Sequence, residues 1–132
     1  VHRPKPMVTD AVDFWLDLPP GRRPTAIAAG SDLLAAQTIQ TLRARGLALP
    51  DDCSVTGYDD EPFAAMLDPP LTTLRVSWAD MGRAAADLLL EVIDNGDGGA
   101  DEDVRRVVVS ACLVQRKSVG PPRGRGADGG GA

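Results

Sequence analysis

The sequence feature that most restricts the fold is a strand, helix and strand pattern between residues 25 and 58. The apolar run Thr25–Ala29 is followed by a glycine and predicts a short buried strand. Residues 32–45 carry apolar side chains at helical spacing, and Gly46 suits the first position after a helix. A second apolar run, Cys53–Tyr58, predicts the next strand. Because strands joined by a crossover helix pair in parallel with a right-handed crossover, we predict an α/β fold.

Further helices and strands are predicted on either side of this unit. Thr9–Leu18 has helical spacing and ends at prolines, and Pro69–Arg75 is proline-initiated and then β-branched, which favours an extended segment. Ser77–Asp94 begins with a capping-box pattern, and Val104–Gln115 predicts one or two final strands. The apolar face of the third helix consists of Met81, Ala84, Ala85, Leu88, Leu89 and Val92.

Composition indicates a globular chain without a nucleic-acid-binding surface. Of its 132 residues, 43% are hydrophobic and only 4% are aromatic, a balance typical of helices packed on a buried sheet. We therefore predict a parallel sheet with helices on both faces. The formal net charge is -5, and the basic residues within 116–132 leave the remainder still more acidic. Because an acidic body repels phosphate groups, we expect DNA binding to require a part outside this chain.

Cysteine usage and hydropathy bear on location. Cys53 and Cys112 lie in apolar stretches at a spacing that suits neither a metal site nor a disulfide framework, so we predict buried, inert thiols. This usage is compatible with the cytoplasm. No apolar run approaches the ~20 residues that a membrane span needs. Val1–Met7 is basic but has no following apolar segment, so it does not predict a secretory signal.

The residues with most chemical potential close the second predicted strand. In a parallel sheet the carboxyl ends of the strands face the ligand crevice, and Asp59 and Asp60 lie at such an end. A carboxylate there can accept two hydroxyl hydrogen bonds at once, which suits a sugar or a similar polyol. The alternative is an Asx-turn, in which either acid only caps the loop before Pro62. The spacing leaves both interpretations open.

The sequence offers little support for catalysis or for a cofactor. His2 is the only histidine and lies near the start of the chain, which argues against a Ser/His/Asp arrangement. Adjacent acids in an extended chain point to opposite faces, so Asp59 and Asp60 do not predict a general acid and base pair. Ser31 either caps the following helix or reaches a ligand, and its turn lacks the glycine-rich dinucleotide fingerprint. We predict no enzymatic activity, no metal and no cofactor.

Several motifs occur together in a specific order. They are Pro24–Asp32, Arg45–Asp60, Pro62–Ala64, Pro69–Leu74 and Met81–Gly82. In order and spacing they resemble the lac-repressor/galactose-repressor family of transcription regulators over about residues 22 to 118. The resemblance implies a two-lobed, periplasmic-binding-protein-like sensor that follows a helix-turn-helix. In such proteins a small molecule between the lobes changes the affinity for the operator, which is a coupling free energy between two sites.

The resemblance also implies how the chain divides between the lobes. The expected parts are a remnant helix and linker (1–21), the C-terminal lobe (22–76), a helix and loop of the other lobe (77–103), returning strands (104–118) and a disordered tail (119–132). In this chain the helix from the other lobe would lack the sheet it packs on. An uncovered apolar face predicts marginal stability or aggregation.

Residue by residue, the resemblance suggests a ligand site. Asp59 matches the ligand-contacting acid of the family. Ser31 stands where sugar-binding members often carry Asn, Ala28 where an aromatic side chain commonly stacks on the ligand, and Val76 where Gln is frequent. These departures imply a smaller and less polar half of the site.

The family resemblance further predicts a homodimer of the full-length parent. The interface candidates are Leu34, Ala35, Thr38, Leu42, Phe63 and Leu67, unless their apolar faces belong to the core. The leading hypothesis is therefore the effector-binding region of a cytoplasmic repressor that binds a sugar-like molecule and reaches DNA only through an N-terminal helix-turn-helix absent from this chain. The alternatives are a fragment of a solute-binding protein for sugar import and a truncated product without activity.

Overall fold

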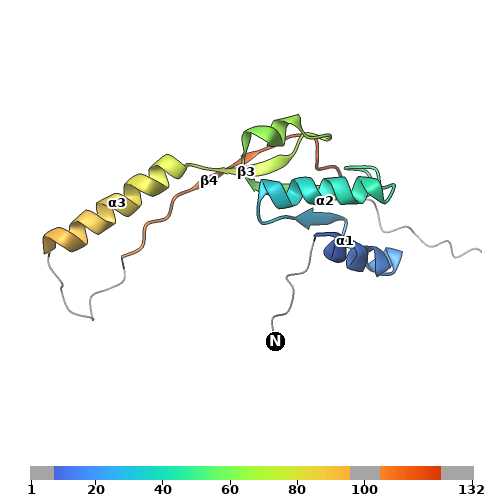
Figure 1. Ribbon diagram of the computed structural model, residues 1–132, viewed down its shortest axis with the longest axis horizontal. Helices are drawn as coiled ribbons and strands as arrows, with labels where there is room; N and C mark the ends of the chain where they lie inside the picture. Colours follow the sequence, from blue (N-terminus) through green and yellow to red (C-terminus); the bar gives the residue numbers. More distant parts are fainter. Residues whose placement is uncertain (1–7, 96–104, 123–132) are drawn as a thin grey trace, which may run out of the picture.

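The computed structural model describes residues 8–95 and 105–122, and Figure 1 shows their arrangement. In chain order the elements are α1 (Val8–Asp17), the 3-10 helix η1 (Pro20–Arg22), β1 (Ala26–Ala28), α2 (Asp32–Ala44), β2 (Ser54–Asp59), the 3-10 helix η2 (Pro62–Met66), β3 (Thr72–Val76), α3 (Trp78–Asn95) and β4 (Ala111–Val114). The predictions for Val1–Met7 and for most of the loop and tail, 96–103 and 123–132, lie outside the described residues.

The four strands form one sheet in the order β1-β2-β3-β4. The first three are parallel, with Ile27 beside Val55 and Gly57 beside Thr73. The final strand is antiparallel to β3 and pairs Cys112 with Arg75. The predicted βαβ unit and the α/β fold are confirmed, and the predicted final strands reduce to β4, because residues 105–110 are extended without pairing.

The core lies on the face of the sheet covered by α2. Ala35, Ile39 and Leu42 of this helix are buried against Val55 and Leu71, because apolar residues at helical spacing turn one stripe towards the strands. In turn, α1 contributes Val12 and Trp15 to the same cluster. The sequence predicts helices on both faces; in the described part of the chain the helices packed on the sheet lie on this one. Across the sheet, Ala26, Ala28 and Leu74 are exposed.

The last helix leaves the sheet entirely. Figure 1 shows α3 extending away from the other elements, with residues 105–110 running back beside it. The pattern predicted the helix, but none of its described residues is buried. Large apolar side chains are exposed along it, including Trp78, Met81, Leu89, Leu90, Val92 and Ile93. We call α3 together with residues 105–110 the arm.

The segment after β4 returns to the body of the protein. Ser118 is buried, receives a hydrogen bond from the amide of Thr72 at 2.8 Å and donates one to the carbonyl of Val55 at 2.6 Å. The amide of Gly120 bonds the hydroxyl of Ser54 at 3.1 Å, so ordered contacts continue past residue 119, where the tail was predicted to begin. On β4 itself, Cys112 is exposed, which contradicts the predicted burial; Cys53 is buried as predicted. No residue of β4 is buried, so its apolar side chains have no covering layer among the described residues.

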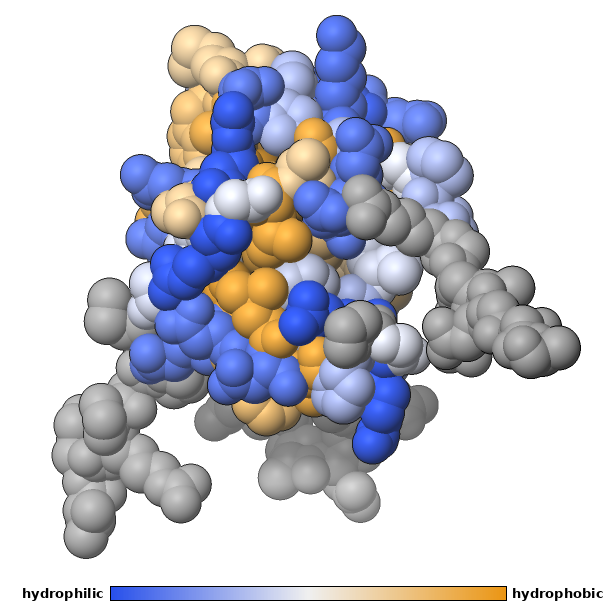
Figure 2. Space-filling model, turned by 90° about the vertical axis from the view of Figure 1, so that its right-hand side faces the viewer, coloured by the Kyte–Doolittle hydropathy of each residue, from blue (hydrophilic) through white to orange (hydrophobic). Residues whose placement is uncertain are grey.

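The end of the molecule opposite the arm has a mixed surface. Figure 2 shows an apolar band on this face, bordered on both sides by hydrophilic side chains. A groove with a volume of about 540 Å³ lies along α2 and is lined by Leu33, Ala36, Gln37, Ile39, Gln40, Arg43, Leu67 and Asp68. Apolar surface therefore remains accessible on the body as well as on the arm.

Candidate functional site

The candidate site lies at the edge where the three parallel strands end. Ala28 closes β1, Asp59 closes β2 and Val76 closes β3, so the fold brings these separate positions to one edge. Ser31 follows β1 at the start of α2. The carboxyl edge of a parallel sheet is where α/β proteins bind ligands, since loops and helix N-termini meet there.

Asp59 and Asp60 form a turn with an uncommon backbone. Their φ angles are 113° and 57°, in the left-handed region that residues other than glycine rarely adopt. The Asp59 side chain is half-buried and makes no hydrogen bond or ion pair with any residue that the structure describes. A carboxylate with unused acceptor sites at this edge can receive hydrogen bonds from a ligand.

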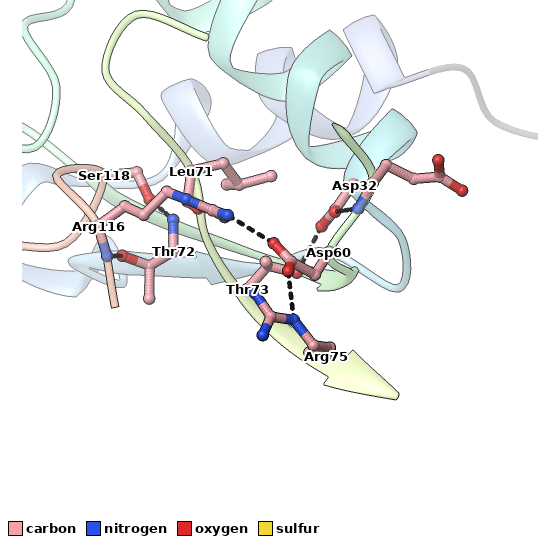
Figure 3. Close-up of polar contacts among 9 residues, drawn as sticks. Asp32, Asp60, Leu71, Thr72, Thr73, Arg75, Arg116 and Ser118 are labelled. Carbon is pink, nitrogen blue, oxygen red and sulfur yellow. Dashed lines mark hydrogen bonds and ion pairs between the residues drawn. The ribbon is translucent and has the colours of Figure 1, made fainter. Parts of the chain in front are cut away.

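Asp60, in contrast, is fully engaged. Figure 3 shows its carboxylate between two arginines: Arg75 Nε lies 2.6 Å from one oxygen and Arg116 Nη2 lies 2.6 Å from the other. Burial would raise the pKa of Asp60, but hydrogen bonds and charge from Arg116 and Arg75 outweigh it and hold that pKa below its ordinary value. Arg116 also donates to the carbonyl of Leu71 at 2.8 Å. This ion cluster therefore joins the end of β2 to β3 and to the segment after β4.

Asp32, the first residue of α2, supports the same turn. It is completely buried, accepts a hydrogen bond from Thr73 Oγ1 at 2.5 Å and accepts another from the amide of Glu61 at 2.7 Å. Gly57 makes room for it, because a Cβ at this position would overlap the Asp32 carboxylate and lie 2.8 Å from Leu71 Cδ2. Figure 3 shows Asp32 and Asp60 side by side at this end of the sheet.

The other predicted ligand residues have less to offer in the described structure. Ser31 accepts a hydrogen bond from the amide of Leu34 at 3.3 Å, which confirms its capping role. Ala28 is exposed and can line a cleft only through its methyl group. Val76 is only 5% exposed, so it presents almost no surface to a ligand. Of the four predicted residues, Asp59 alone combines accessibility with strong acceptor capacity.

The predicted interface residues divide into two groups. Ala35 and Leu42 are fully buried in the core, and Thr38 is buried with its hydroxyl bonded to the carbonyl of Leu34, so these three cannot form an exposed interface. They were predicted on the wrong side of α2 because a helix with apolar residues on two sides does not reveal which side is covered. Leu34 is 44% exposed, while Phe63 and Leu67 are half-buried.

Sequence reasoning did not identify the supporting residues of the site. In the sequence analysis Asp32 is only the first residue of the predicted helix, and Arg116 is only one of the basic residues within 116–132. The available signal was the pair Thr72 and Thr73, because hydroxyl groups within a buried parallel strand require polar partners.

The described residues contain neither a metal-binding cluster nor a membrane-spanning helix. Within 8–95 and 105–122, no group of three or more His, Cys, Asp or Glu side chains is arranged to hold a metal ion. None of the helices in these ranges is long and apolar enough to cross a bilayer.

Comparison with known proteins finds relatives that are named as transcription regulators or repressors. Residues 1–119 match the family model described as a periplasmic binding protein-like domain. The ribose operon repressor of Haemophilus influenzae is 37% identical over 97 residues, which are 74% of this chain and 28% of that protein. The HTH-type transcriptional regulator MalR of Streptomyces coelicolor is 43% identical over 98 residues, covering 74% of this chain and 27% of that protein.

Solved structures agree with these relatives. A LacI family transcriptional regulator from Lactobacillus casei, crystallised with bound sucrose, matches with a TM-score of 0.63 and 32% identity over 85% of this chain and 39% of that chain. This chain thus spans well under half the length of the proteins it matches. By its family model, its relatives and its fold, the chain belongs to the periplasmic binding protein-like domains, in the form carried by regulators of the LacI family.

Proposed function

We propose that this chain is the effector-binding region of a DNA-binding transcriptional regulator that acts as a repressor and binds a sugar-like molecule in a cleft at the carboxyl edge of β1, β2 and β3. The observation that carries the proposal is the Asp59 carboxylate, which ends a parallel strand and has no partner among the described residues. Its two oxygens can accept from neighbouring hydroxyls of a polyol, and such charge-assisted bonds are the strong kind. The sucrose bound to the Lactobacillus casei relative supports this ligand class.

The second half of the cleft belongs to another lobe in this proposal. Residues 22–76 and 104–118 form most of the C-terminal lobe, 77–103 belong to the other lobe, and 1–21 lead into the body. The uncovered apolar side chains of α3 support the division, since a helix with this pattern packs on a sheet when one is present. The connections after β3 and before β4 then act as the hinge, and ligand-induced closure changes operator affinity.

Dimerisation through the α2 surface completes the proposal. The groove beside α2 is apolar along Leu33 and Leu67 and ends at the exposed ion pair between Arg43 and Asp68. With Leu34 and Phe63, these residues replace the buried ones in the predicted interface. An apolar patch bounded by charged residues is the usual composition of such contacts.

A regulator fits the comparisons better than a solute-binding protein for sugar import, because the relatives reported above are named as regulators or repressors. A regulator acts on DNA in the cytoplasm, and no enzymatic step belongs to this proposal. The coding sequence upstream of residue 1 distinguishes the two: a helix-turn-helix supports the regulator, and a signal peptide supports the import protein.

The site is tested in the full-length regulator with Asp59→Ala. We expect the variant to lose the thermal stabilisation that sucrose, glucose, ribose or cellobiose confers on the wild type, because a ligand that binds only the folded state raises its stability. Binding of an operator fragment should persist without the sugar response. Asp13→Asn serves as the matched control, because Asp13 lies on α1 and the change removes its exposed ion pair with Arg45. An Asp59→Ala protein that responds like this control contradicts the proposal.

A further inference from the structure

We propose that Asp60, bound by Arg75 and Arg116 beside the buried Asp32, is a positioning residue that holds the Asp59 carboxylate in one orientation towards the cleft. The proposal rests on the function proposed above, in which Asp59 receives hydrogen bonds from the effector. Neither acid is itself available to a ligand, since Asp32 is 0% exposed and the Asp60 side chain is 7% exposed. Their hydrogen bonds reach only groups of the protein.

The turn that carries Asp59 needs support. Asp59 and Asp60 have φ angles of 113° and 57°, and such conformations persist in residues other than glycine only where surrounding contacts maintain them. If the turn relaxed to negative φ, the Cα–Cβ bond of Asp59 would leave the backbone in another direction. The orientation of its carboxylate therefore depends on what holds residues 60 and 61.

Two carboxylates supply that support from different elements. Asp60 is held by Arg75 on β3 and by Arg116 after β4, each at 2.6 Å. Asp32, at the start of α2, accepts from the amide of Glu61 at 2.7 Å and is itself fixed by Thr73 Oγ1 at 2.5 Å. Both residues that follow Asp59 are thus anchored to the sheet.

This arrangement separates two tasks between neighbouring acids. Asp60 uses its oxygens on arginines, which leaves Asp59 without a partner among the described residues. Had the arginines lain beside Asp59 instead, its acceptor sites would be occupied. Arg75 lies one residue before the end of β3, so its ion pair also ties the turn to the strand that leads into the arm.

The experiment compares three variants. Asp60→Asn keeps the size of the side chain and tolerates the left-handed region, yet removes the charge that the arginines bind. Arg75→Gln removes one ion pair from a side chain that is 61% exposed, so it tests the same support if Asp60→Asn fails to fold. Asp13→Asn is the control, because it removes an exposed ion pair at 2.8 Å on α1.

Two readouts are measured. The first is the three-bond coupling between the amide and Hα protons of Asp59 in the isotope-labelled 132-residue chain, which reports its φ angle. The second is the calorimetric affinity of the full-length regulator for sucrose, glucose and ribose. We expect Asp60→Asn and Arg75→Gln to change the coupling and to weaken sugar binding by about ten- to a hundredfold, the usual cost of losing a hydrogen bond to a charged group. Asp13→Asn should change neither.

An unchanged Asp59 coupling in Asp60→Asn and Arg75→Gln overturns the proposal, and so does an affinity equal to that of the control. If the wild-type regulator binds none of the sugars, the proposed ligand class is wrong. The coupling then decides alone whether Asp60 and its arginines position Asp59, so the two failures remain distinct.

Discussion

The helices α2 and α3 were both predicted from apolar residues at helical spacing, yet their surroundings are opposite. On α2, Ala35, Ile39 and Leu42 are buried against the sheet, whereas no described residue of α3 is buried. Both sequences form helices, so the pattern determines the helix and its apolar face. It does not supply the partner, which for α2 lies in the same chain and for α3 does not lie among the described residues. The body and the arm should therefore respond differently to the same kind of substitution.

Truncation of a leucine should give the largest difference. Leu42→Ala in the fully buried core is expected to lower the free energy of unfolding of the 132-residue chain by about 2–5 kcal/mol, through lost burial and the cavity it leaves. Leu89→Ala, at a side chain 60% exposed on the arm, should change it by less than about 0.5 kcal/mol. Urea unfolding measures both. Equal losses would mean that the arm is covered in solution, and the comparison would fail.

Two glycine-to-alanine substitutions should have smaller effects on stability, and their signs should be opposite in the body and in the arm. Gly57→Ala places a methyl group against Asp32 and Leu71, and overpacking of this kind costs about 1–3 kcal/mol. Gly82→Ala meets nothing within 4 Å on α3 and should favour the helix by about 0.5–1 kcal/mol.

The measurements for this pair are the urea midpoint for the body and the helical circular dichroism signal for the arm. We expect Gly82→Ala to raise helicity while the midpoint stays unchanged. A midpoint that rises with helicity would show that the arm and the body unfold as one unit.

The smallest expected effect is the change in how steeply folding stability falls as the pH is lowered. The pKa of Asp60 is lowered in the folded chain, because the hydrogen bonds and charges of Arg116 and Arg75 outweigh its burial. A lowered folded pKa contributes stability above the unfolded value of about 4 and loses it as the pH falls through the folded value. The pKa of Asp80 is also lowered, by hydrogen bonds from Ser77 and Arg83, but on the arm.

We therefore expect the urea midpoint of the wild type to fall more steeply than that of Asp60→Asn between about pH 5 and about pH 3. Asp80→Asn should keep the wild-type slope, because α3 has no buried contact through which to affect the body. A reduced slope in Asp80→Asn but not in Asp60→Asn would reverse the comparison between the two regions.

The candidate site shows the same division between local and distant information. The end of the second strand and the acid at its tip were predictable, because Gly57, Tyr58 and the acids that follow are neighbours in sequence. Their support was not predictable. Asp32 and Thr73 are 41 positions apart, and Asp60 and Arg116 are 56 apart. Only the packing of α2 on the sheet and the pairing of β4 with β3 bring them together. Likewise, Cys112 has an apolar neighbourhood in sequence but lies exposed on the last strand.

The sequence by itself determined the helices, the βαβ unit, the family and the position of Asp59, because these depend on residue spacing and on motifs read along the chain. Only the tertiary structure decided which apolar faces are covered, which acid is engaged by arginines and which remains without a partner. Burial and ion pairing depend on what residues far apart in the chain place in the same space. For α3, the described tertiary structure leaves the apolar face that the sequence predicted without a covering layer.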